Sequence, residues 1–344
     1  MSKGSRLEKS LIHMKSFYFL GLMTLAAAGL HGQPTTGAKY WSTTAPDCSS
    51  LNENPVTIKD ASGATVGYSC WVSGTFAWLA AGNGWGSVIR VAAPTSGAIG
   101  VDYQFYDPSG NDLKIDTTLV GGSTTSGNDV NFALFPNQPA EVDLLGAQGG
   151  APNYSALTTG SVYAVFYCPN AATCGTVLPQ LLYSFLPTKP WLLSVPISWD
   201  SGIWTQWSAE GIDDGGRRLV SLVVYNQNQV AAIFTVRVYD STGALVGTGT
   251  TPSIAGFGTY GDLVSNVIKT TLPQGVFKVL IDGGSNYSSV VALQFIGDSA
   301  SSLQVAYDYA PGTGASAPAP ALRTNARRDR VANTPKSIFD TLPQ

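Results

Sequence analysis

The chain repeats one pattern at two places, Val101-Asp-Tyr-Gln-Phe-Tyr-Asp-Pro-Ser-Gly110 and Phe234-Thr-Val-Arg-Val-Tyr-Asp-Ser-Thr-Gly243. In both segments apolar residues alternate with polar ones, and the alternation leads into Asp, a Ser or Thr, and Gly. A period of two is typical of a β-strand with one buried face. The segments lie 133 residues apart with their inward positions matched. Because a shift of one residue would reverse every face, the match indicates an internal repeat of strands.

The turn that ends each repeat has a physical explanation. Asp caps the turn backbone, Ser or Thr tolerates the middle, and Gly takes the left-handed position where the next strand begins. A third copy is Asp60-Ala-Ser-Gly63. A calcium loop is the alternative at Asp107, where Ser109, Asn111 and Asp112 add oxygens. Its match to a calcium-binding loop is poor, and the other two copies lack the last two residues, so we expect hairpin turns.

Further alternating segments fill both halves of the chain, at 88–92, 130–134, 142–145, 161–167, 219–225, 276–281, 290–295 and 303–307. Short strands with regular turns are typical of antiparallel sandwiches. We expect an all-β fold of two tandem antiparallel β-sandwich domains of the immunoglobulin-like kind, at residues 33–187 and 188–309. One large sandwich or barrel is the alternative. If the two domains are independent, Val at Gly110 or Gly243 should destabilise only its own sandwich.

Composition narrows the class of protein further. Asp, Glu, Lys and Arg make up 12% of the 344 residues, compared with about 25% in a typical soluble domain. The chain has 38 Gly and 20 Pro, and 44% of its residues are apolar. This is too apolar for a disordered chain and too rich in Gly and Pro for a helical one.

Residues 1–32 have the layout of a secretory signal peptide. The basic region contains Lys3, Arg6, Lys9 and Lys15. An uncharged apolar run follows from Phe17 to Leu30, and small residues near its end suit cleavage. A membrane anchor is the alternative, but the run is short compared with the span of about 20 residues that a membrane requires. We therefore expect a secreted protein, extracellular or periplasmic, that begins between Gly29 and Pro34 and has no transmembrane segment after cleavage.

The four cysteines fit an oxidising compartment. Cys48 and Cys70 flank a strand-like segment, while Cys168 and Cys174 bracket a short loop. Four cysteines allow three pairings, and local geometry favours the disulfides Cys48–Cys70 and Cys168–Cys174. A four-thiolate zinc site is the alternative, but its usual pair of Cys-x-x-Cys knuckles is absent.

Charge is divided unevenly along the chain. The leader and the tail from Arg323 onward each carry +3, so the total of −3 leaves −9 for residues 33–322. An acidic body offers no footprint for phosphate contacts, and we expect no nucleic-acid partner. We expect residues 310–344 to be a disordered, basic tail, because its Pro- and Ala-rich start cannot bury enough apolar surface.

One region of the sequence resembles a known group of proteins. The region comprises Phe76-Ala-Trp-Leu-Ala-Ala-Gly-Asn-Gly-Trp85, then 88–92, then Phe105-Tyr-Asp-Pro-Ser-Gly110. It is similar to uncharacterised secreted bacterial proteins with tandem immunoglobulin-like β-sandwich repeats, over about residues 75–310. The second copy departs from the pattern at Arg217 and Arg218, and the first two cysteines lie outside it. The resemblance implies export and a non-catalytic role, and it supplies no catalytic residues.

The sequence lacks the residues that most enzyme chemistries require. The two histidines, His13 and His31, belong to the expected leader, which excludes a Ser-His-Asp triad, a Cys-His pair or a His-ligated metal in the mature chain. No Gly-x-Ser-x-Gly elbow and no phosphate-binding glycine loop occurs. A Ser-Lys hydrolase has no positive support. We expect no metal and no cofactor.

Paired carboxylates are the remaining enzymatic option, as in a glycosidase. The mature chain has three glutamates, Glu53, Glu141 and Glu210. Asp200, Glu210, Asp213 and Asp214 crowd one loop. A solvated acidic loop is the simpler interpretation.

The same loop carries Trp199, Trp204 and Trp207 within nine residues. Flat aromatic faces beside polar groups such as Asp200 suit sugar rings, so these four residues are the candidate ligand site. The alternative is that the tryptophans fill the joint between the two sandwiches, since buried Trp is ordinary core material. We favour burial.

The sequence thus predicts an exported protein that is not an enzyme. Its expected role is a cell-surface or extracellular interaction or structural module, with an extracellular protein or a polysaccharide as partner. The alternative is a carbohydrate-binding module that uses the tryptophan loop.

Overall fold

The computed structural model describes residues 39–60, 62–119, 124–147, 156–185, 189–200, 205–213, 218–296, 304–307 and 310–311. All of them belong to one compact unit, Ala38–Pro343. The expected signal peptide, 1–32, and residues 312–344 of the expected tail lie outside the described residues. Within the described part, no helix has the length and apolar character needed to cross a membrane.

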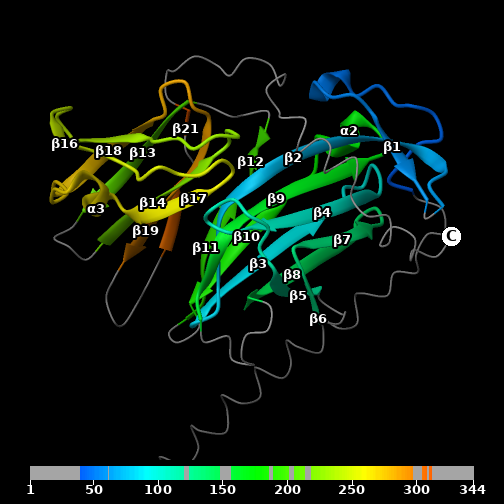
Figure 1. The fold of residues 1–344 in the computed structure, drawn as a ribbon, viewed down its shortest axis with the longest axis horizontal. Coiled ribbons are helices and arrows are strands. Elements are labelled where there is room, and N and C mark those ends of the chain that lie inside the picture. Colours follow the sequence, from blue (N-terminus) through cyan, green and yellow to red (C-terminus); the bar gives the residue numbers. More distant parts are fainter. Residues whose placement is uncertain are drawn as a thin grey trace, which may run out of the picture. The chain divides into compact units, whose positions relative to one another are not determined.

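The first sandwich consists of two antiparallel sheets (Figure 1). One sheet has the order β1 (Val56–Lys59), β2 (Thr65–Ala81), β9 (Thr158–Cys168), β4 (Ile99–Tyr106) and β7 (Asp129–Leu134), and β12 (Ser198–Trp199) pairs with β2. The other has the order β11 (Lys189–Pro196), β10 (Gln180–Phe185), β3 (Trp85–Ala92), β8 (Pro139–Ala147), β5 (Ile115–Leu119) and β6 (Thr124–Gly127). Two short helices flank the first sheet, η1 (Ser49–Leu51) and α2 (Ala171–Cys174).

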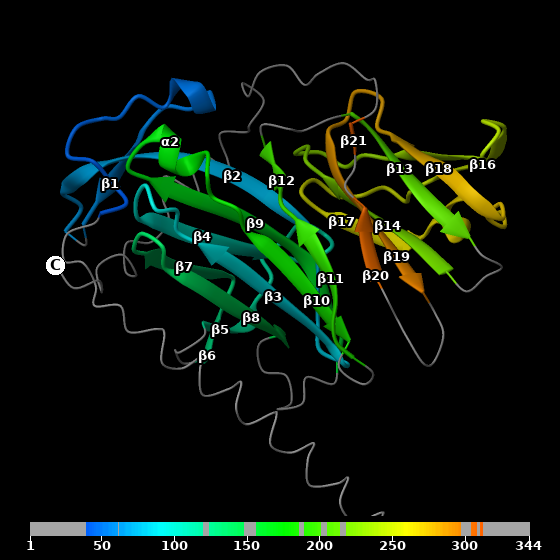
Figure 2. The ribbon, with the colours of Figure 1, turned by 180° about the vertical axis from the view of Figure 1, so that it is seen from behind.

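The second sandwich is built in the same way (Figure 2). Its first sheet has the order β16 (Leu245–Thr250), β15 (Thr235–Tyr239), β18 (Gly275–Asp282), β13 (Gln206–Asp213) and β21 (Ala310–Pro311). Its second sheet has the order β17 (Thr259–Leu263), β14 (Arg218–Asn226), β19 (Ser288–Ile296) and β20 (Gln304–Tyr307), and α3 (Val264–Ile268) follows β17. The prediction of an all-β fold with two antiparallel sandwiches is confirmed.

The sheets divide the chain a little later than expected. The boundary expected between residues 187 and 188 falls between β10 and β11, which pair with each other. β12 also belongs to the first sandwich, through Trp199 opposite Gly74 of β2. β21 pairs with β13 and so lies in a sheet of the second sandwich, beyond the expected end at residue 309.

The three Asp-containing turns have one geometry. Asp60, Asp107 and Asp240 each accept, on carboxylate Oδ1, the backbone N–H groups of the residues two and four positions later. The following glycines, Gly63, Gly110 and Gly243, have φ of 87°, 80° and 84°, so each takes the predicted left-handed position. The Thr242 hydroxyl, with the amides of residues 242–244, lowers the pKa of Asp240. The turn chemistry expected from the sequence is confirmed.

The same turn serves two topologies. At Asp60 and Asp240 it closes a hairpin, β1–β2 and β15–β16. At Asp107 the strand that follows, β5, pairs with β8 in the opposite sheet instead. The Asp107 turn still closes a short hairpin, because an antiparallel bridge joins Tyr106 to Asp112 and Leu113 donates its N–H to the Phe105 carbonyl. The local repeat of β4 and β15 does not extend beyond that bridge.

The two sandwiches meet at a break in the ladder of β2. Its pairing with β9 shifts between Phe76 and Leu79, so that Ala77 and Trp78 leave the regular register. The carbonyl of Ala77 then accepts a buried hydrogen bond from Thr259 Oγ1 at 2.9 Å. Thr259 also donates its backbone N–H to the carbonyl of Pro108 at 3.0 Å. We call these four residues, Ala77, Trp78, Pro108 and Thr259, the inter-sandwich joint.

Strand β14 is buried on both of its faces at this joint. Val220, Leu222 and Val224 belong to the core of the second sandwich. Val223 and Tyr225, which point the other way, are 2% and 1% exposed and belong to the core cluster of the first sandwich. The cores of the two sandwiches are therefore in contact through one strand.

Gly110 lies directly against the second sandwich. A Cβ at this position would come within 2.3 Å of the Gly256 carbonyl oxygen, whereas a Cβ at Gly243 would meet nothing within 4 Å. The expectation that a change at Gly110 affects only its own sandwich is therefore wrong, because this turn is part of the contact between the two.

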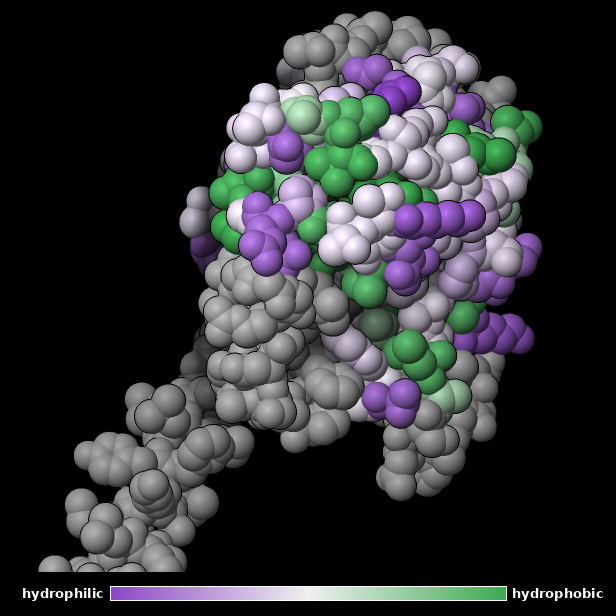
Figure 3. Space-filling model, turned by 90° about the vertical axis from the view of Figure 1, so that its left-hand side faces the viewer, coloured by the Kyte–Doolittle hydropathy of each residue, from purple (hydrophilic) through white to green (hydrophobic). Residues whose placement is uncertain are grey.

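Apolar side chains also reach the surface of the second sandwich. Four large ones are strongly exposed, Val230, Ile233, Leu245 and Val276. Figure 3, which views the molecule from one side, shows apolar patches among polar residues. Scattered apolar residues are normal on a protein surface.

Gly110 and Gly243 offer a matched pair of substitutions. Both have the same turn and the same sign of φ, so Gly→Ala at either site should cost about 1–2 kcal/mol from backbone strain alone. We expect Gly110→Ala to cost more, because its Cβ also collides with the Gly256 carbonyl. Denaturant unfolding of the two variants measures the difference. Equal costs would show that the joint is not formed in solution.

Candidate functional site

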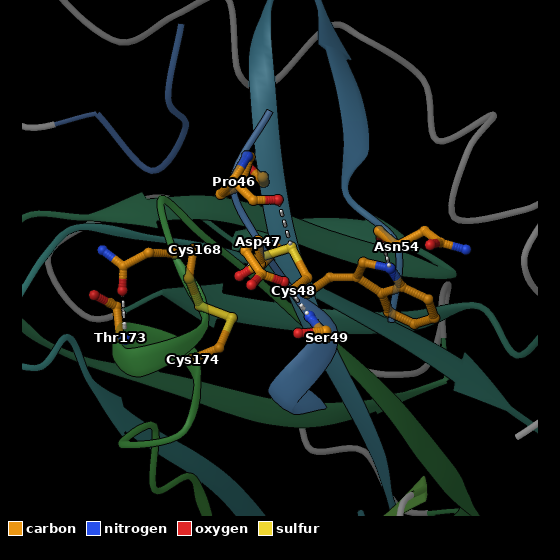
Figure 4. Close-up of a disulfide and its surroundings, with 12 residues drawn as sticks. Pro46, Asp47, Cys48, Ser49, Asn54, Cys168, Thr173 and Cys174 are labelled. Carbon is orange, nitrogen blue, oxygen red and sulfur yellow. Dashed lines mark hydrogen bonds between the residues drawn. A yellow bond between two sulfur atoms is a disulfide. The ribbon is translucent and has the colours of Figure 1, made fainter. Parts of the chain in front are cut away.

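Two disulfides start from one pair of facing residues. Cys70 of β2 lies directly opposite Cys168 of β9. Cys70 is bonded to Cys48, before η1, and Cys168 is bonded to Cys174, at the end of α2 (Figure 4). Both predicted pairings are confirmed, and no cysteine is free. The bonds fix two loops beside the same end of the sheet.

Local hydrogen bonds shape these two loops. Asp47 accepts the N–H of Ser49 at 2.9 Å, and its hydrogen bonds with Ser49 lower the pKa of Asp47. Asn170 caps α2 by accepting the N–H of Thr173, also at 2.9 Å. Trp71 donates its indole N–H to the carbonyl of Asn54. Each loop is thus held by side chains as well as by its disulfide.

A cavity of about 260 Å³ lies beside the two loops. Its walls come from residues 50–53, which follow Cys48, from residues 72–73 of β2, from residues 174–175 and 177–178, which follow α2, and from Trp199 of β12. Glu53 on its wall is only 7% exposed, whereas Leu178 is 78% exposed. Residues from four separate segments of the sequence therefore line one cavity.

Trp199 is placed on this wall by the pairing of β12 with β2. It lies opposite Gly74, where a Cβ would come within 2.7 Å of the Ser198 carbonyl oxygen. The indole ring contacts the ring of Phe166 edge to face, with centroids 5.9 Å apart. Trp199 is partly buried and packs against the first core, so part of its surface is left for the cavity.

Asp200 links the end of β12 to strands β2 and β9 of the same sheet. Its Oδ2 accepts a hydrogen bond of 2.5 Å from the Ser73 hydroxyl and one of 3.1 Å from the Tyr163 hydroxyl. Asp200 is therefore engaged in holding its own segment in place. It is not one of the residues that line the cavity.

The other two tryptophans of the candidate loop do not join Trp199. Trp207 is 6% exposed in the core of the second sandwich, where its indole N–H donates to the Ser288 carbonyl at 3.0 Å. Trp204 lies outside the described residues. Burial was expected for Trp207, but it lies inside one core rather than in the joint. Trp199 and Trp207 belong to different sandwiches.

The acidic residues of the same loop are also separated. Asp200 follows a strand of the first sandwich, while Glu210 and Asp213 lie on β13 of the second. Glu210 is exposed, and Asp214 lies outside the described residues. Among the described residues, no group of three His, Cys, Asp or Glu is arranged to hold a metal ion.

Sequence reasoning missed Glu53, Ser73 and Leu178 as wall residues. The signal that could have found them is their nearness to cysteines, because a disulfide fixes the short segment next to each of its ends. Their convergence on Trp199 depends on strand pairing that no local pattern records.

No protein family matches the chain, and none of the curated proteins does. Among solved structures the chain is similar to "Lactobacillus rhamnosus Beta-glucuronidase", at 11% sequence identity and a TM-score of 0.14. The match covers 70% of this chain and 35% of that one. At that TM-score it supports no statement about fold or function.

The different settings of Trp207 and Trp199 predict different costs of truncation. Trp207→Ala removes a fully packed side chain and leaves the Ser288 carbonyl without its donor, so we expect a loss of about 3–5 kcal/mol. Trp199→Ala, at a partly exposed position, should cost about 0.5–3 kcal/mol. Denaturant unfolding compares the two. A Trp207→Ala loss below that of Trp199→Ala would contradict the burial described above.

Proposed function

We propose that this chain is an exported, non-catalytic protein whose two β-sandwiches act as an interaction or structural module at the cell surface or in the extracellular space. The observation that carries the proposal is the pair of disulfides at one end of β2 and β9. Disulfides persist in oxidising compartments and are rare in the cytosol. The signal-like residues 1–32 support the same compartment independently.

A non-catalytic role is supported by where the three glutamates lie. Glu141 pairs with Arg90 at 2.5 Å on the surface. Glu210 is exposed on β13 of the other sandwich, and Glu53 is buried at the cavity. A glycosidase needs two carboxyl groups a fixed distance apart across one bond, and these three glutamates belong to three separate regions.

An interaction role is supported by the joint. Thr259 spans the two sandwiches with hydrogen bonds to Ala77 and Pro108, and Val223 and Tyr225 pack into the neighbouring core. Contacts of this kind fix the two sandwiches relative to each other, and a partner that touches both then loses less entropy on binding.

Carbohydrate binding is the second candidate function. The observation in its favour is Trp199, which lies on a cavity wall beside Ser73 and Glu53. Carbohydrate binding at this cavity uses Trp199 alone. It does not use the platform of Trp199, Trp204 and Trp207 that the sequence suggests.

The compartment can be tested by expressing the full chain with its leader in a host with an export pathway. We expect an extracytoplasmic product that begins between Gly29 and Pro34. Peptide mapping without reduction should give Cys48–Cys70 and Cys168–Cys174. A cytoplasmic product with four free thiols would contradict export, and a Cys48–Cys168 linkage would contradict the pairing.

The non-catalytic role can be tested on the same product. We expect no product release from a panel of polysaccharides, aryl glycosides and esters, and retention of the protein on at least one immobilised polysaccharide or extracellular matrix protein. Glu53→Gln provides the control, because it removes the buried carboxylate with little change in volume. Turnover that this substitution abolishes would make the protein an enzyme.

A further inference from the structure

We propose that the cavity beside Trp199 binds a single neutral sugar ring. This inference deepens the second candidate function, and it rests on that function. It replaces a three-tryptophan surface by one partly open site in the first sandwich, at which Leu178 remains exposed.

The size of the cavity limits the ligand. Ligand pockets for drug-sized molecules usually measure about 300–1,000 Å³, and this cavity measures about 260 Å³. It therefore suits one ring with its substituents, such as the end of a glycan, rather than a stretch of polymer.

The walls differ in polarity. Leu51, Val72 and Leu178 line the cavity together with the Trp199 indole, and Ser73 and Glu53 also belong to its walls. A pyranose has a C–H face that packs on an aromatic ring and a rim of hydroxyl groups that need hydrogen-bond partners. Apolar and polar groups contribute comparable shares of the walls, and a few placed polar groups beside an apolar surface fix the orientation of such a ligand.

Charge excludes acidic ligands from this site. Glu53 is the one charged residue among those that line the cavity, and Asp200 lies directly behind Ser73, to which it is hydrogen-bonded. Both carboxylates repel an anion at close range. Phosphorylated sugars and uronic acids are therefore disfavoured.

Hydrogen-bond capacity distinguishes a neutral sugar from a cation. Asn52 and Ser50 line the cavity beside Glu53, and an amide and a hydroxyl both donate and accept. A sugar hydroxyl can likewise do both, whereas an ammonium group only donates and so can pair with Glu53 but not with the amide N–H groups of Asn52. The donor and acceptor set favours hydroxyl groups.

The covalent frame makes the cavity preformed. Residues 50–53 are tied to β2 through Cys48–Cys70, and residues 174–178 are tied to β9 through Cys168–Cys174. Asp200 acts as a positioning residue, because its bonds to Ser73 and Tyr163 hold the segment that carries Trp199. A site fixed in advance loses less entropy when it binds a small ligand.

The test is a titration of the oxidised mature protein with glucose, galactose and mannose, followed by the indole N–H signals in ¹H–¹⁵N NMR spectra. Glucuronic acid and glucosamine serve as the matched anion and cation. We expect saturable shifts of the Trp199 signal with at least one neutral sugar, weaker binding of glucosamine, and no shift with glucuronic acid. Assignment uses Trp199→Phe, which removes that signal, and Trp207→Phe is the control in the other sandwich.

Variants locate the site. Glu53→Gln, which replaces a charged acceptor by a neutral one, and Ser73→Ala, which removes a hydroxyl group, should each weaken binding of the neutral sugar about tenfold or more. Trp207→Phe should leave the affinity unchanged. Unfolding midpoints identify any variant that has lost its fold. If one of the two wall variants is unfolded, the affinity of the other wall variant tests the position of the site.

Three outcomes would overturn the proposal: binding of the anion or the amine alone, no sugar binding, or sugar binding that neither wall variant weakens. None of them bears on the interaction module itself, which fails only if the retention assay above finds no partner. Retention on a surface protein without any sugar binding would leave the module and remove this site.

Discussion

Strand β2 is seventeen residues long, Thr65–Ala81. The backbone N–H and C=O groups along both of its edges need hydrogen-bond partners. A buried backbone group without a partner costs about as much as a lost hydrogen bond. β2 meets part of this requirement with β1, opposite residues 65–69, and with β12, opposite residues 74–75, along one edge, and with β9, opposite residues 70–76 and 79–81, along the other. Where the ladder with β9 breaks, the Ala77 carbonyl bonds to Thr259 instead. The disulfide frame, the cavity wall and the inter-sandwich joint all depend on this strand.

The joint follows from the same requirement applied to the second sandwich. Thr259 is buried, and leaving a buried hydroxyl unbonded would cost about 1–3 kcal/mol. Its hydroxyl finds the carbonyl that the bulge of β2 exposes, while Val223 and Tyr225 bury their apolar surface against the first core. Two domains that look tandem in sequence thereby share part of a core.

Local chemistry was predictable from the sequence, and long-range pairing was not. The Asp–Gly turns are determined by five residues, and the disulfides by short spacings, so both predictions are confirmed. The joint had one signal, the run Leu219-Val-Ser-Leu-Val-Val-Tyr225, which is apolar except for Ser221, since a strand buried on both faces loses its alternation. The same run also fits an ordinary core strand. Trp199 was predicted as a candidate, but its partners Glu53 and Ser73 could not be, because their meeting depends on the pairing of β12 with β2. Trp207 is close to Trp199 in sequence, but the two side chains lie in different sandwiches.

The facing positions of Cys70 and Cys168 have a consequence for biogenesis. Directly opposed residues of antiparallel strands have Cα atoms about 4.5–5.5 Å apart, which is within the range that a disulfide accepts. A Cys70–Cys168 bridge therefore competes with the two native bonds whenever all four thiols are free in a formed sheet. Under the export proposed above, translocation from the N-terminus delivers Cys48 and Cys70 to the oxidising side before Cys168, so the first native bond can close while its competitor is still absent. Export of this kind favours the native pairing, whereas a fully reduced chain that refolds all at once needs thiol–disulfide exchange to reach the same state.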